Sequence, residues 1–285
     1  MKAASIRFLG PYMVGVVVLI LVPALLSGYF AFTNATGLNS PSPNGLANFH
    51  RMLADPFLPD ALRASAIHVG LAVPLRLLTA TGLGLLLAAP RRGGRWYRVA
   101  VYTPTVIPDV ALALLALWAF NPLFGPVNQV LGAVGLPQPV WLSTPWGARW
   151  AVVLMLVLPI GEAFLIVLAT RRQIPASLYE AAALEGYGPV RRLWHVTLPQ
   201  LSPILVLLAI RDVILTLQVN FVPGYLLTDG KPGNATLYLP LYIYDQAFEF
   251  SGFGYAAMIT LAMTAGSATL IALMLLLARR WGLLR

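Results

Sequence analysis

The chain has 285 residues, of which 59% are apolar and only 10% are charged, whereas about a quarter of the residues in an ordinary soluble domain are charged. This composition excludes a typical soluble enzyme and indicates a polytopic membrane protein. The formal net charge of +9 does not indicate nucleic-acid binding, because the basic residues lie between long apolar runs rather than on one water-facing surface. The absence of cysteine excludes a disulfide framework and a thiolate metal site.

Six stretches are long and apolar enough to cross a bilayer, which requires about 20 apolar residues in a helix. The predicted spans are residues 11–32, 64–90, 99–120, 151–170, 202–227 and 255–278. The first follows basic residues, as the core of a signal peptide does, but its uncharged run of 22 residues exceeds the roughly 7–15 residues of such a core and predicts a retained helix. The expected fold is all-α, with six transmembrane helices in a single domain over residues 1–285.

The distribution of lysine and arginine predicts the orientation, since short cytoplasmic loops keep positive charge during insertion. A cytoplasmic N-terminus places thirteen basic residues inside, namely Lys2, Arg7, Arg91, Arg92, Arg95, Arg98, Arg171, Arg172, Arg191, Arg192, Arg279, Arg280 and Arg285. Only Arg51, Arg63, Arg149 and Lys231 then lie outside. Both termini are therefore expected in the cytoplasm. The outer loops 33–63, 121–150 and 228–254, which are rich in Gly, Pro, Asn and aromatic residues, are expected to dock an extracytoplasmic partner.

The long cytoplasmic loop, residues 171–201, has clear local signals. Pro175 suits a first helical turn, and Ser177 with Glu180 has the spacing of a capping box, so a short helix is expected to start here. Gly186 can adopt the left-handed conformation that ends a helix. Pro189 is expected to open a second short helix, and Pro199 to turn the chain back toward the membrane. A loop resting on lipid headgroups is the alternative, favoured by the four arginines and Trp194.

At this loop the chain resembles the permeases of binding-protein-dependent ABC importers. Their cytoplasmic signature is Glu-Ala-Ala, three residues, Gly, nine residues, an aliphatic residue, one residue and Leu-Pro. Its positions are occupied here by Glu180, Ala181, Ala182, Gly186, Val196, Leu198 and Pro199. Glu185 and Tyr187 differ from the residues usual in relatives, Asp and Ala, but neither occupies a signature position. The resemblance implies a type I ABC importer permease fold in which this loop carries a coupling helix that contacts an ATPase.

Other stretches resemble the sugar importers, specifically the maltose-type and glycerol-phosphate-type first permease. They are Pro104 and Pro108 followed by residues 121–142, then residues 226–236 and 242–257. Lys231 replaces a glycine that is usual in the second of these stretches. The resemblance implies a carbohydrate substrate, a second homologous permease, two cytoplasmic ATPase subunits, an extracytoplasmic sugar-binding protein, and a place in the inner membrane of a bacterial or archaeal cell.

The chain is not expected to be an enzyme, because it contains no Gly-x-x-x-x-Gly-Lys-Ser/Thr phosphate loop. ATP and Mg are expected on the partner ATPase, and no cofactor on this chain. No metal site is expected either, since His68 and His195 are far apart in the sequence without a second ligand nearby, and His50 lies in an outer loop.

Ionisable residues inside the predicted spans mark candidate transport pathways, because such groups are costly in a membrane unless they face protein or water. They are Arg76, Asp109, Glu162, Arg211 and Asp212. Arg211 and Asp212 are adjacent, so their side chains are expected to pair with other helices rather than with each other. Two roles remain open for the five residues: structural ion pairs or a gate, and direct contact with the substrate.

Four residues of the fifth span are candidates for the substrate pathway, namely Thr216, Gln218, Asn220 and Phe221. Amides offer donors and acceptors to sugar hydroxyls, and an aromatic ring can cover an apolar sugar face. In maltose-type permeases, polar and aromatic residues at this place line the sugar site, and Asn220 and Phe221 match an Asn-Phe pair there. Hydrogen bonding between helices is the alternative role. Pro223 and Gly224 are expected to break the helix beside a cavity.

Two other classes of function compete with the importer. An ion-gradient-driven secondary transporter could use Asp109 and Glu162 as a proton relay, but it has no use for the cytoplasmic signature, and no inverted repeat is evident. A membrane enzyme would need convergent catalytic groups, and the sequence shows none. The substrate remains open among oligosaccharides, monosaccharides, polyols and glycerol phosphates.

Overall fold

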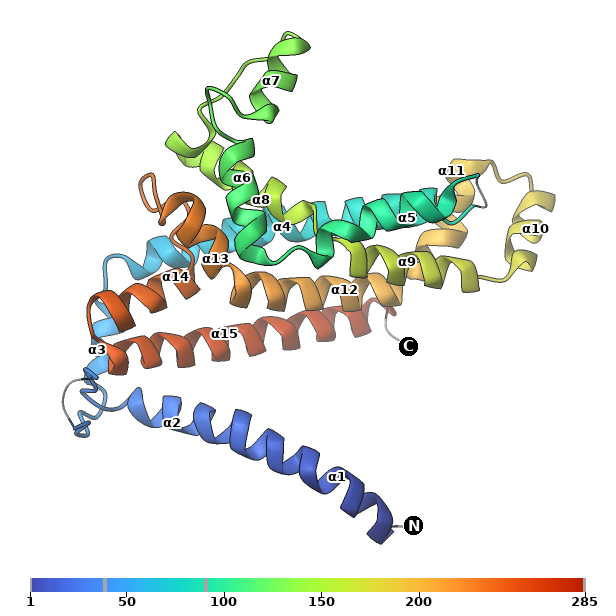
Figure 1. Ribbon diagram of the computed structural model, residues 1–285. Helices are drawn as coiled ribbons and strands as arrows, with labels where there is room; N and C mark the ends of the chain where they lie inside the picture. The colour runs from blue at the N-terminus through green and yellow to red at the C-terminus, as the bar shows by residue number, and fades with distance from the viewer. Residues whose placement is uncertain (1, 38–39, 90–91, 284–285) are drawn as a thin grey trace. The chain divides into compact units, whose positions relative to one another are not determined.

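The computed structural model describes residues 2–37, 40–89 and 92–283. Pro90 and Arg91, at the predicted end of the second span, and Arg285 lie outside the described residues. The described chain is built almost entirely of helices, which confirms the all-α fold (Figure 1). The α-helices are α1 (Lys2–Val16), α2 (Val22–Phe30), α3 (Ala47–Leu53), α4 (Leu58–Leu86), α5 (Gly94–Tyr102), α6 (Asp109–Ala119), α7 (Pro126–Ala133), α8 (Pro145–Val157), α9 (Gly161–Gln173), α10 (Ala176–Leu184), α11 (Pro189–Arg192), α12 (Leu198–Val219), α13 (Phe221–Pro223), α14 (Leu239–Tyr244) and α15 (Phe253–Arg280).

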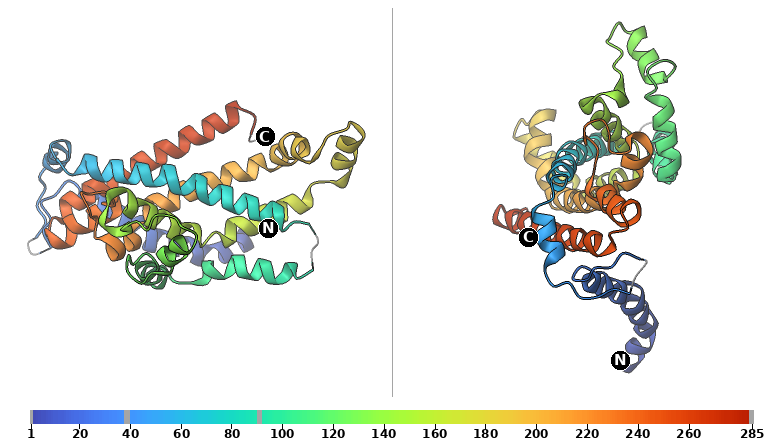
Figure 2. Two further views of the ribbon diagram at one scale, coloured as in Figure 1. Left: turned by 90° about the horizontal axis from the view of Figure 1, so that it is seen from above. Right: turned by 90° about the vertical axis from the view of Figure 1, so that its left-hand side faces the viewer.

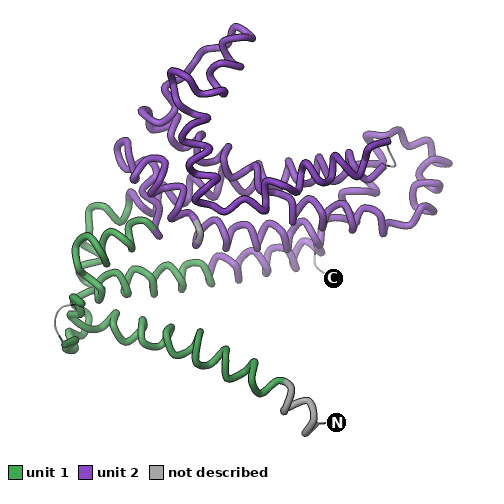
Figure 3. The backbone as a smooth tube through the Cα atoms, in the orientation of Figure 1, with its two compact units in different colours: residues 1–59, 241–268 green, residues 60–240, 269–285 purple. Residues whose placement is uncertain are grey.

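Shorter helical turns link several of these helices. The 3-10 turns are Thr103–Val106 and Trp141–Ser143, and the π-helical turns are Val17–Leu21, Leu193–Thr197, Gly224–Thr228 and Asp245–Glu249. The described chain forms two compact units, residues 1–59 with 241–268 and residues 60–240 with 269–285 (Figure 3). We call them unit 1 and unit 2.

Four continuous helices in the described part of the chain are long and apolar enough to cross a membrane: Leu9–Phe30, Leu58–Leu86, Pro189–Gln218 and Phe253–Arg280. Two bent pairs raise the number to six if each pair is one span. The pairs are Gly94–Val106 with Asp109–Ala119, bent by 101°, and Pro145–Val157 with Gly161–Gln173, bent by 51°. Each pair covers one predicted span.

Both bends occur at a proline. Pro108 follows the extended residue Ile107 and precedes α6, as expected because a proline disfavours the helical conformation in the residue before it. Pro159 lies in the break between α8 and α9. It has no N–H to continue the hydrogen-bond ladder of α8.

Unit 1 is held together by polar contacts around α3. The side-chain amide of Asn48 donates to the backbone carbonyl oxygens of Ala31 and Thr33, each at 2.8 Å. The Arg51 guanidinium lies 4.1 Å from the ring centroid of Tyr255 and donates to Oε1 of Gln246 at 3.2 Å. These contacts connect α3 to the residues after α2, to the π-helical turn Asp245–Glu249 and to the first turn of α15.

Unit 2 contains two apolar clusters. The first includes Ala64 from α4, Leu112 from α6, Val152 from α8 and Leu227 from the π-helical turn after α13. The second includes Ala80 from α4, Phe164 from α9 and Leu208 from α12. The bend between α8 and α9 therefore divides the fourth span between the two clusters, and α4 and the fifth span contribute to both.

The structure corrects three details of the loop 171–201. No capping box forms, because Pro175 itself is the extended residue before α10 and Ser177 already lies inside the helix. The second helix is not short, since it runs without a break from Pro189 to Gln218. Pro199 does not turn the chain: it lies in the first turn of α12, where its missing N–H is tolerated, directly after the wider π-helical turn Leu193–Thr197.

Several span boundaries also differ from the prediction; the helices of the third and fourth spans, for example, begin at Gly94 and Pro145 rather than at residues 99 and 151. The second membrane helix begins at Leu58, six residues earlier than expected, so Arg63 is part of α4 and not of a loop. The fifth span is interrupted at Asn220, the residue directly after α12, and helical turns resume at Phe221. The sequence predicts this break at Pro223 and Gly224, whereas the structure has it three residues before Pro223.

Candidate functional site

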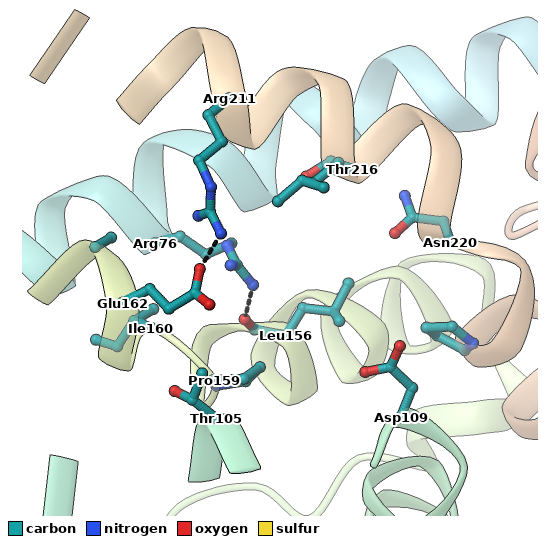
Figure 4. Close-up of a pocket in the computed structure, with 13 residues that line it drawn as sticks. Arg76, Thr105, Asp109, Leu156, Pro159, Ile160, Glu162, Arg211, Thr216 and Asn220 are labelled. Atoms are coloured by element: carbon teal, nitrogen blue, oxygen red, sulfur yellow. Dashed lines mark hydrogen bonds and ion pairs between the residues drawn. The ribbon is translucent and has the colours of Figure 1, made fainter. Parts of the chain in front are cut away.

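A cavity of about 220 Å³, lined by both ionisable and apolar side chains, lies in unit 2 (Figure 4). Its lining comes from α4, from the residues around the bends in the third and fourth spans, and from the C-terminal half of α12 with the residues that follow it. The lining residues are Arg76, Thr105, Asp109, Leu156, Pro159, Ile160, Glu162, Ala163, Arg211, Leu215, Thr216, Asn220 and Pro223. On α4, Arg76 lies between a residue of the first apolar cluster and a residue of the second. On the fifth span, the polar lining residues lie in the same way between the residues of the two clusters. The cavity is therefore located between the two apolar clusters of unit 2.

The buried side of the cavity contains an ion pair between α4 and α12. Nε of Arg76 lies 2.9 Å from Oδ2 of Asp212, and the two side chains are only 15% and 4% exposed. The same guanidinium donates a hydrogen bond to the backbone carbonyl oxygen of Leu156. That carbonyl is available because the N–H of Ile160, its usual partner in a helix, bonds to Leu158 at the break. The bend in the fourth span therefore provides a backbone hydrogen-bond acceptor for Arg76.

A second ion pair joins α12 to α9 at the open side of the cavity. The Arg211 guanidinium donates to a carboxylate oxygen of Glu162, and these side chains are 40% and 52% exposed. Nη1 of Arg211 also lies 3.9 Å from Oδ1 of Asp212, which is beyond hydrogen-bond distance. The prediction that Arg211 and Asp212 pair with other helices is confirmed, because each has its shortest ion pair with a different helix.

Asp109 is the remaining ionisable residue of the cavity. It is the first residue of α6, is exposed, and has no ion-pair or hydrogen-bond partner among the residues described. In Figure 4 it lies on the side of Asn220, away from Arg211 and Glu162. Four of the five intramembrane ionisable residues therefore line this cavity. The fifth, Asp212, does not line it but is paired with Arg76, which does.

Two of the four uncharged candidates line the cavity. Thr216 and Asn220 are buried there and lie four residues apart, on the same face of the helix. Gln218, which the sequence analysis placed with them, is exposed and is not part of the lining, because it lies two residues from each and so points to another side of the helix. The ring of Phe221 stacks on Tyr225 with centroids 5.3 Å apart, and it does not line the cavity either.

The sequence interpretation did not identify six of the lining residues: Thr105, Leu156, Pro159, Ile160, Ala163 and Leu215. Thr105 accepts a hydrogen bond from the backbone N–H of Gly161 at 2.8 Å. Leu156 lies in the last turn of α8, and Pro159 lies in the break that follows. Prolines inside apolar spans are the signal that could have found them, because a broken membrane helix tends to line a cavity.

The signature residues occupy α10, the turn after it and the start of α12. Gly186 has a φ of 77°, and its N–H and that of Tyr187 bond to the carbonyl oxygens of Ala183 and Ala182 at 3.0 and 2.9 Å. This is the Schellman arrangement of hydrogen bonds, which confirms the predicted left-handed end of the helix. Glu180 and Ala181 are exposed, whereas Ala182 is buried.

Aromatic contacts hold α10 against its neighbours at one end of unit 2 (Figures 1 and 2). The hydroxyl groups of Tyr179 and Thr197 are 2.9 Å apart, and the Arg171 guanidinium lies 4.3 Å from the ring centroid of Tyr179. The face of α10 that carries Glu180 and Ala181 stays open, and Leu184 is 91% exposed. The geometry is that of a short helix with a free face, braced against α9 and the start of the fifth span.

Comparison with known proteins agrees with this fold. The family described as "Binding-protein-dependent transport system inner membrane component" matches residues 80–283. The probable ABC transporter permease protein YesP of Bacillus subtilis is 31% identical over 277 residues, which cover 94% of this chain and 88% of the relative. The lactose transport system permease protein LacF of Rhizobium radiobacter is 32% identical over 285 residues, covering 95% and 93%.

A solved structure has the same fold. It is the crystal structure of a bacterial alginate ABC transporter in complex with an alginate pentasaccharide-bound periplasmic protein, and its similar chain has a TM-score of 0.83 at 20% identity, covering 96% of this chain and 93% of that chain. The family match and the similarity to YesP together show that this chain belongs to the inner membrane components of binding-protein-dependent transport systems.

Proposed function

We propose that this chain is a permease subunit of an ATP-driven sugar importer, acting as one transmembrane domain that forms half of the translocation pathway. Its partners would be a second homologous permease, two cytoplasmic ATPase subunits and an extracytoplasmic sugar-binding protein. ATP and Mg would bind to the ATPase subunits, and both termini would lie in the cytoplasm. The proposal of a sugar substrate is supported by the relatives, one of which is named for lactose. A second similar structure is that of a bacterial ABC transporter named for import of the acidic polysaccharide alginate, so these names leave the charge of the substrate open.

One observation carries the proposal: a single helix joins the signature loop to the cavity. The helix Pro189–Gln218 is continuous and contains Leu198 and Pro199 of the signature as well as Arg211, Asp212 and Thr216. Thr216 follows Leu198 by 18 residues, which is about 27 Å along an α-helix. A movement of α10 caused by ATPase closure would thus be transmitted through a rigid helix to one wall of the cavity. Coupled alternating access requires that the ATPase subunits interact differently with the two states of the permease, and their contact with α10 would supply this difference.

The cavity supports the second half of the proposal. Hydroxyl and amide groups of Thr105, Thr216 and Asn220 line it, and such groups donate and accept hydrogen bonds with sugar hydroxyls. A proton relay through Asp109 and Glu162 is not favoured, because Glu162 is already paired with Arg211 and the family is one of binding-protein-dependent transporters.

The coupling role can be tested with Glu180→Lys and Gly186→Pro. The first reverses a charge on the free face of α10, and the second cannot adopt the positive φ of Gly186. We expect both variants to reach the membrane in normal amounts but to recover about ten-fold less ATPase subunit per chain, measured by quantitative mass spectrometry after mild detergent extraction, which corresponds to about 1.4 kcal/mol of lost association. Uptake of substrate should then no longer follow ATP hydrolysis.

Gln173→Lys is the matched control, because it adds a cation to the same loop at the exposed end of α9 rather than on α10. It should recover as much ATPase as the unmodified chain. Normal ATPase recovery and normal uptake in both Glu180→Lys and Gly186→Pro would contradict the coupling role.

A further inference from the structure

One carboxylate in the lining of the cavity is unpaired among the described residues. The two guanidinium groups of the lining, those of Arg76 and Arg211, are each engaged by a carboxylate, Asp212 and Glu162 respectively. Asp212 does not itself line the cavity. Asp109 does, and it has no partner among the described residues, so the unbalanced negative charge of the site is located there.

Neither arginine is a free cation. The Arg76 side chain is 15% exposed and holds both Asp212 and the carbonyl oxygen of Leu156. The pair of Arg211 with Glu162 is exposed, and such a pair contributes little to stability. An anion that displaced Glu162 from Arg211 would, however, release a second carboxylate into the cavity. The free group that a substrate meets in this cavity is therefore a carboxylate.

Asp109 occupies the first turn of α6 and lines the cavity. It lies across the cavity from the Arg211–Glu162 pair and on the side of Asn220 (Figure 4). A carboxylate accepts strong hydrogen bonds from hydroxyl groups and pairs with an ammonium group, whereas it repels another carboxylate, sulfonate or phosphate.

We infer that this cavity selects neutral or amino-bearing sugars over acidic ones, and that Asp109 is the residue that sets this preference. The inference rests on the proposed function, because it assigns the class of sugar to the pathway proposed above. Thr216 and Asn220 then bind hydroxyl groups that all three classes of sugar share, while Asp109 discriminates between them by charge.

The test uses the intact importer in lipid nanodiscs, without its binding protein, and three sugars of one scaffold: glucose, glucuronate and glucosamine. Dissociation constants are measured by saturation-transfer NMR at neutral pH. We expect glucuronate to bind about ten-fold more weakly than glucose, and glucosamine at least as tightly as glucose. In Asp109→Asn, glucuronate should come within about three-fold of glucose, and glucosamine should lose any advantage.

Two further variants make the result specific. Asp229→Asn removes an exposed carboxylate outside the cavity, one that already pairs with Lys231, and should keep the order of the three sugars. Asn220→Ala should weaken all three sugars by a similar factor, because it removes a contact that does not depend on charge.

Glucuronate binding as tightly as glucose, or an Asp109→Asn variant with the original order of affinities, would overturn the selectivity inferred for Asp109. Failure of all three sugars to bind the intact importer is a different result. It would overturn the sugar pathway itself, and the inference with it.

Discussion

Asp55, in the first predicted outer loop and in unit 1, is the acceptor of a compact hydrogen-bond network. Its carboxylate accepts from the hydroxyl groups of Tyr242 and Tyr255 and from the backbone N–H groups of Phe57 and Leu58. Burial by itself would raise the pKa of Asp55, but these four hydrogen bonds outweigh it and hold the pKa below its ordinary value. Burial and the neighbouring carboxylate raise the pKa of Tyr242, so its hydroxyl remains a donor.

This network predicts a pH-dependent contribution to stability. A carboxyl group whose pKa is lowered by folding stabilises the folded state above its unfolded pKa, and this contribution is lost as the pH falls through the folded value. Asp55→Asn should therefore lower the unfolding midpoint at pH 7, by an amount that reflects about 1–3 kcal/mol for hydroxyl donors left without their acceptor. The difference from the unmodified chain should shrink as the pH falls from 5 to below about 3.8.

The measurement is thermal unfolding in one detergent across that pH range. Asp60→Asn serves as the control, since this exposed carboxylate accepts a hydrogen bond from Asn234 at 2.9 Å and is not part of the network. A difference for Asp55→Asn that stays constant with pH would contradict the role of the ionised carboxylate.

The two bent spans show how single elements shape the site. The backbone N–H of Gly161 donates to Oγ1 of Thr105 at 2.8 Å. A Cβ atom at Gly161 would lie 2.8 Å from Cδ2 and 2.9 Å from the Cα of Tyr102, closer than packed atoms tolerate. The bend of the fourth span thus packs against the bend of the third only because residue 161 has no side chain.

Gly161→Ala is expected to destabilise the chain by about 1–3 kcal/mol, because part of the clash is with backbone that cannot move without shifting α5. Gly82→Ala is the matched substitution, as a Cβ atom at Gly82 in α4 would meet nothing within 4 Å. It should be neutral or stabilise by about 0.5–1 kcal/mol, since alanine favours a helix over glycine. Unfolding midpoints measured side by side should move in opposite directions; a similar shift for both variants would contradict this account of the bends.

At the scale of the whole molecule, the arrangement of charges predicts which loops face the cytoplasm. The 3-10 turn Trp141–Ser143 connects the third and fourth predicted spans, and α10 connects the fourth and fifth. Consecutive loops must lie on opposite sides of the membrane if each bent pair is one span. The positive-inside rule places α10, flanked by Arg171, Arg172, Arg191 and Arg192, in the cytoplasm.

Single-cysteine labelling can test this orientation directly, because the chain contains no cysteine. Ser143→Cys and Ser177→Cys change the same residue type at two exposed positions. A membrane-impermeant maleimide added to intact spheroplasts should label the first variant and leave the second unlabelled until the membrane is opened. Labelling of Ser177→Cys in intact spheroplasts would reverse the predicted topology and remove α10 from the reach of a cytoplasmic ATPase.

The sequence by itself determined the class of fold, the approximate positions of the six apolar stretches, the signature and the left-handed turn at Gly186. These features are encoded in contiguous residues: hydrophobic length, charge between apolar runs, and the conformational freedom of one glycine. The capping box failed as a prediction because Pro175 occupies the N-cap position and the helix already begins at Ala176, one residue before Ser177. Two local signals predict different starts for this helix, the proline at residue 175 and the Ser177–Glu180 spacing, and the structure follows the proline.

Only the tertiary structure decided the site. Arg76 meets Asp212 across 136 residues of sequence, and Arg211 meets Glu162 across 49, so neither pair follows from any local pattern. The sequence identified all five charged residues as costly in a membrane, but not which of them would remain unpaired. That outcome depends on where the bends at Pro108 and Pro159 place α6 and α9, because packing of the spans, and not the order of residues along them, determines which charges can reach one another.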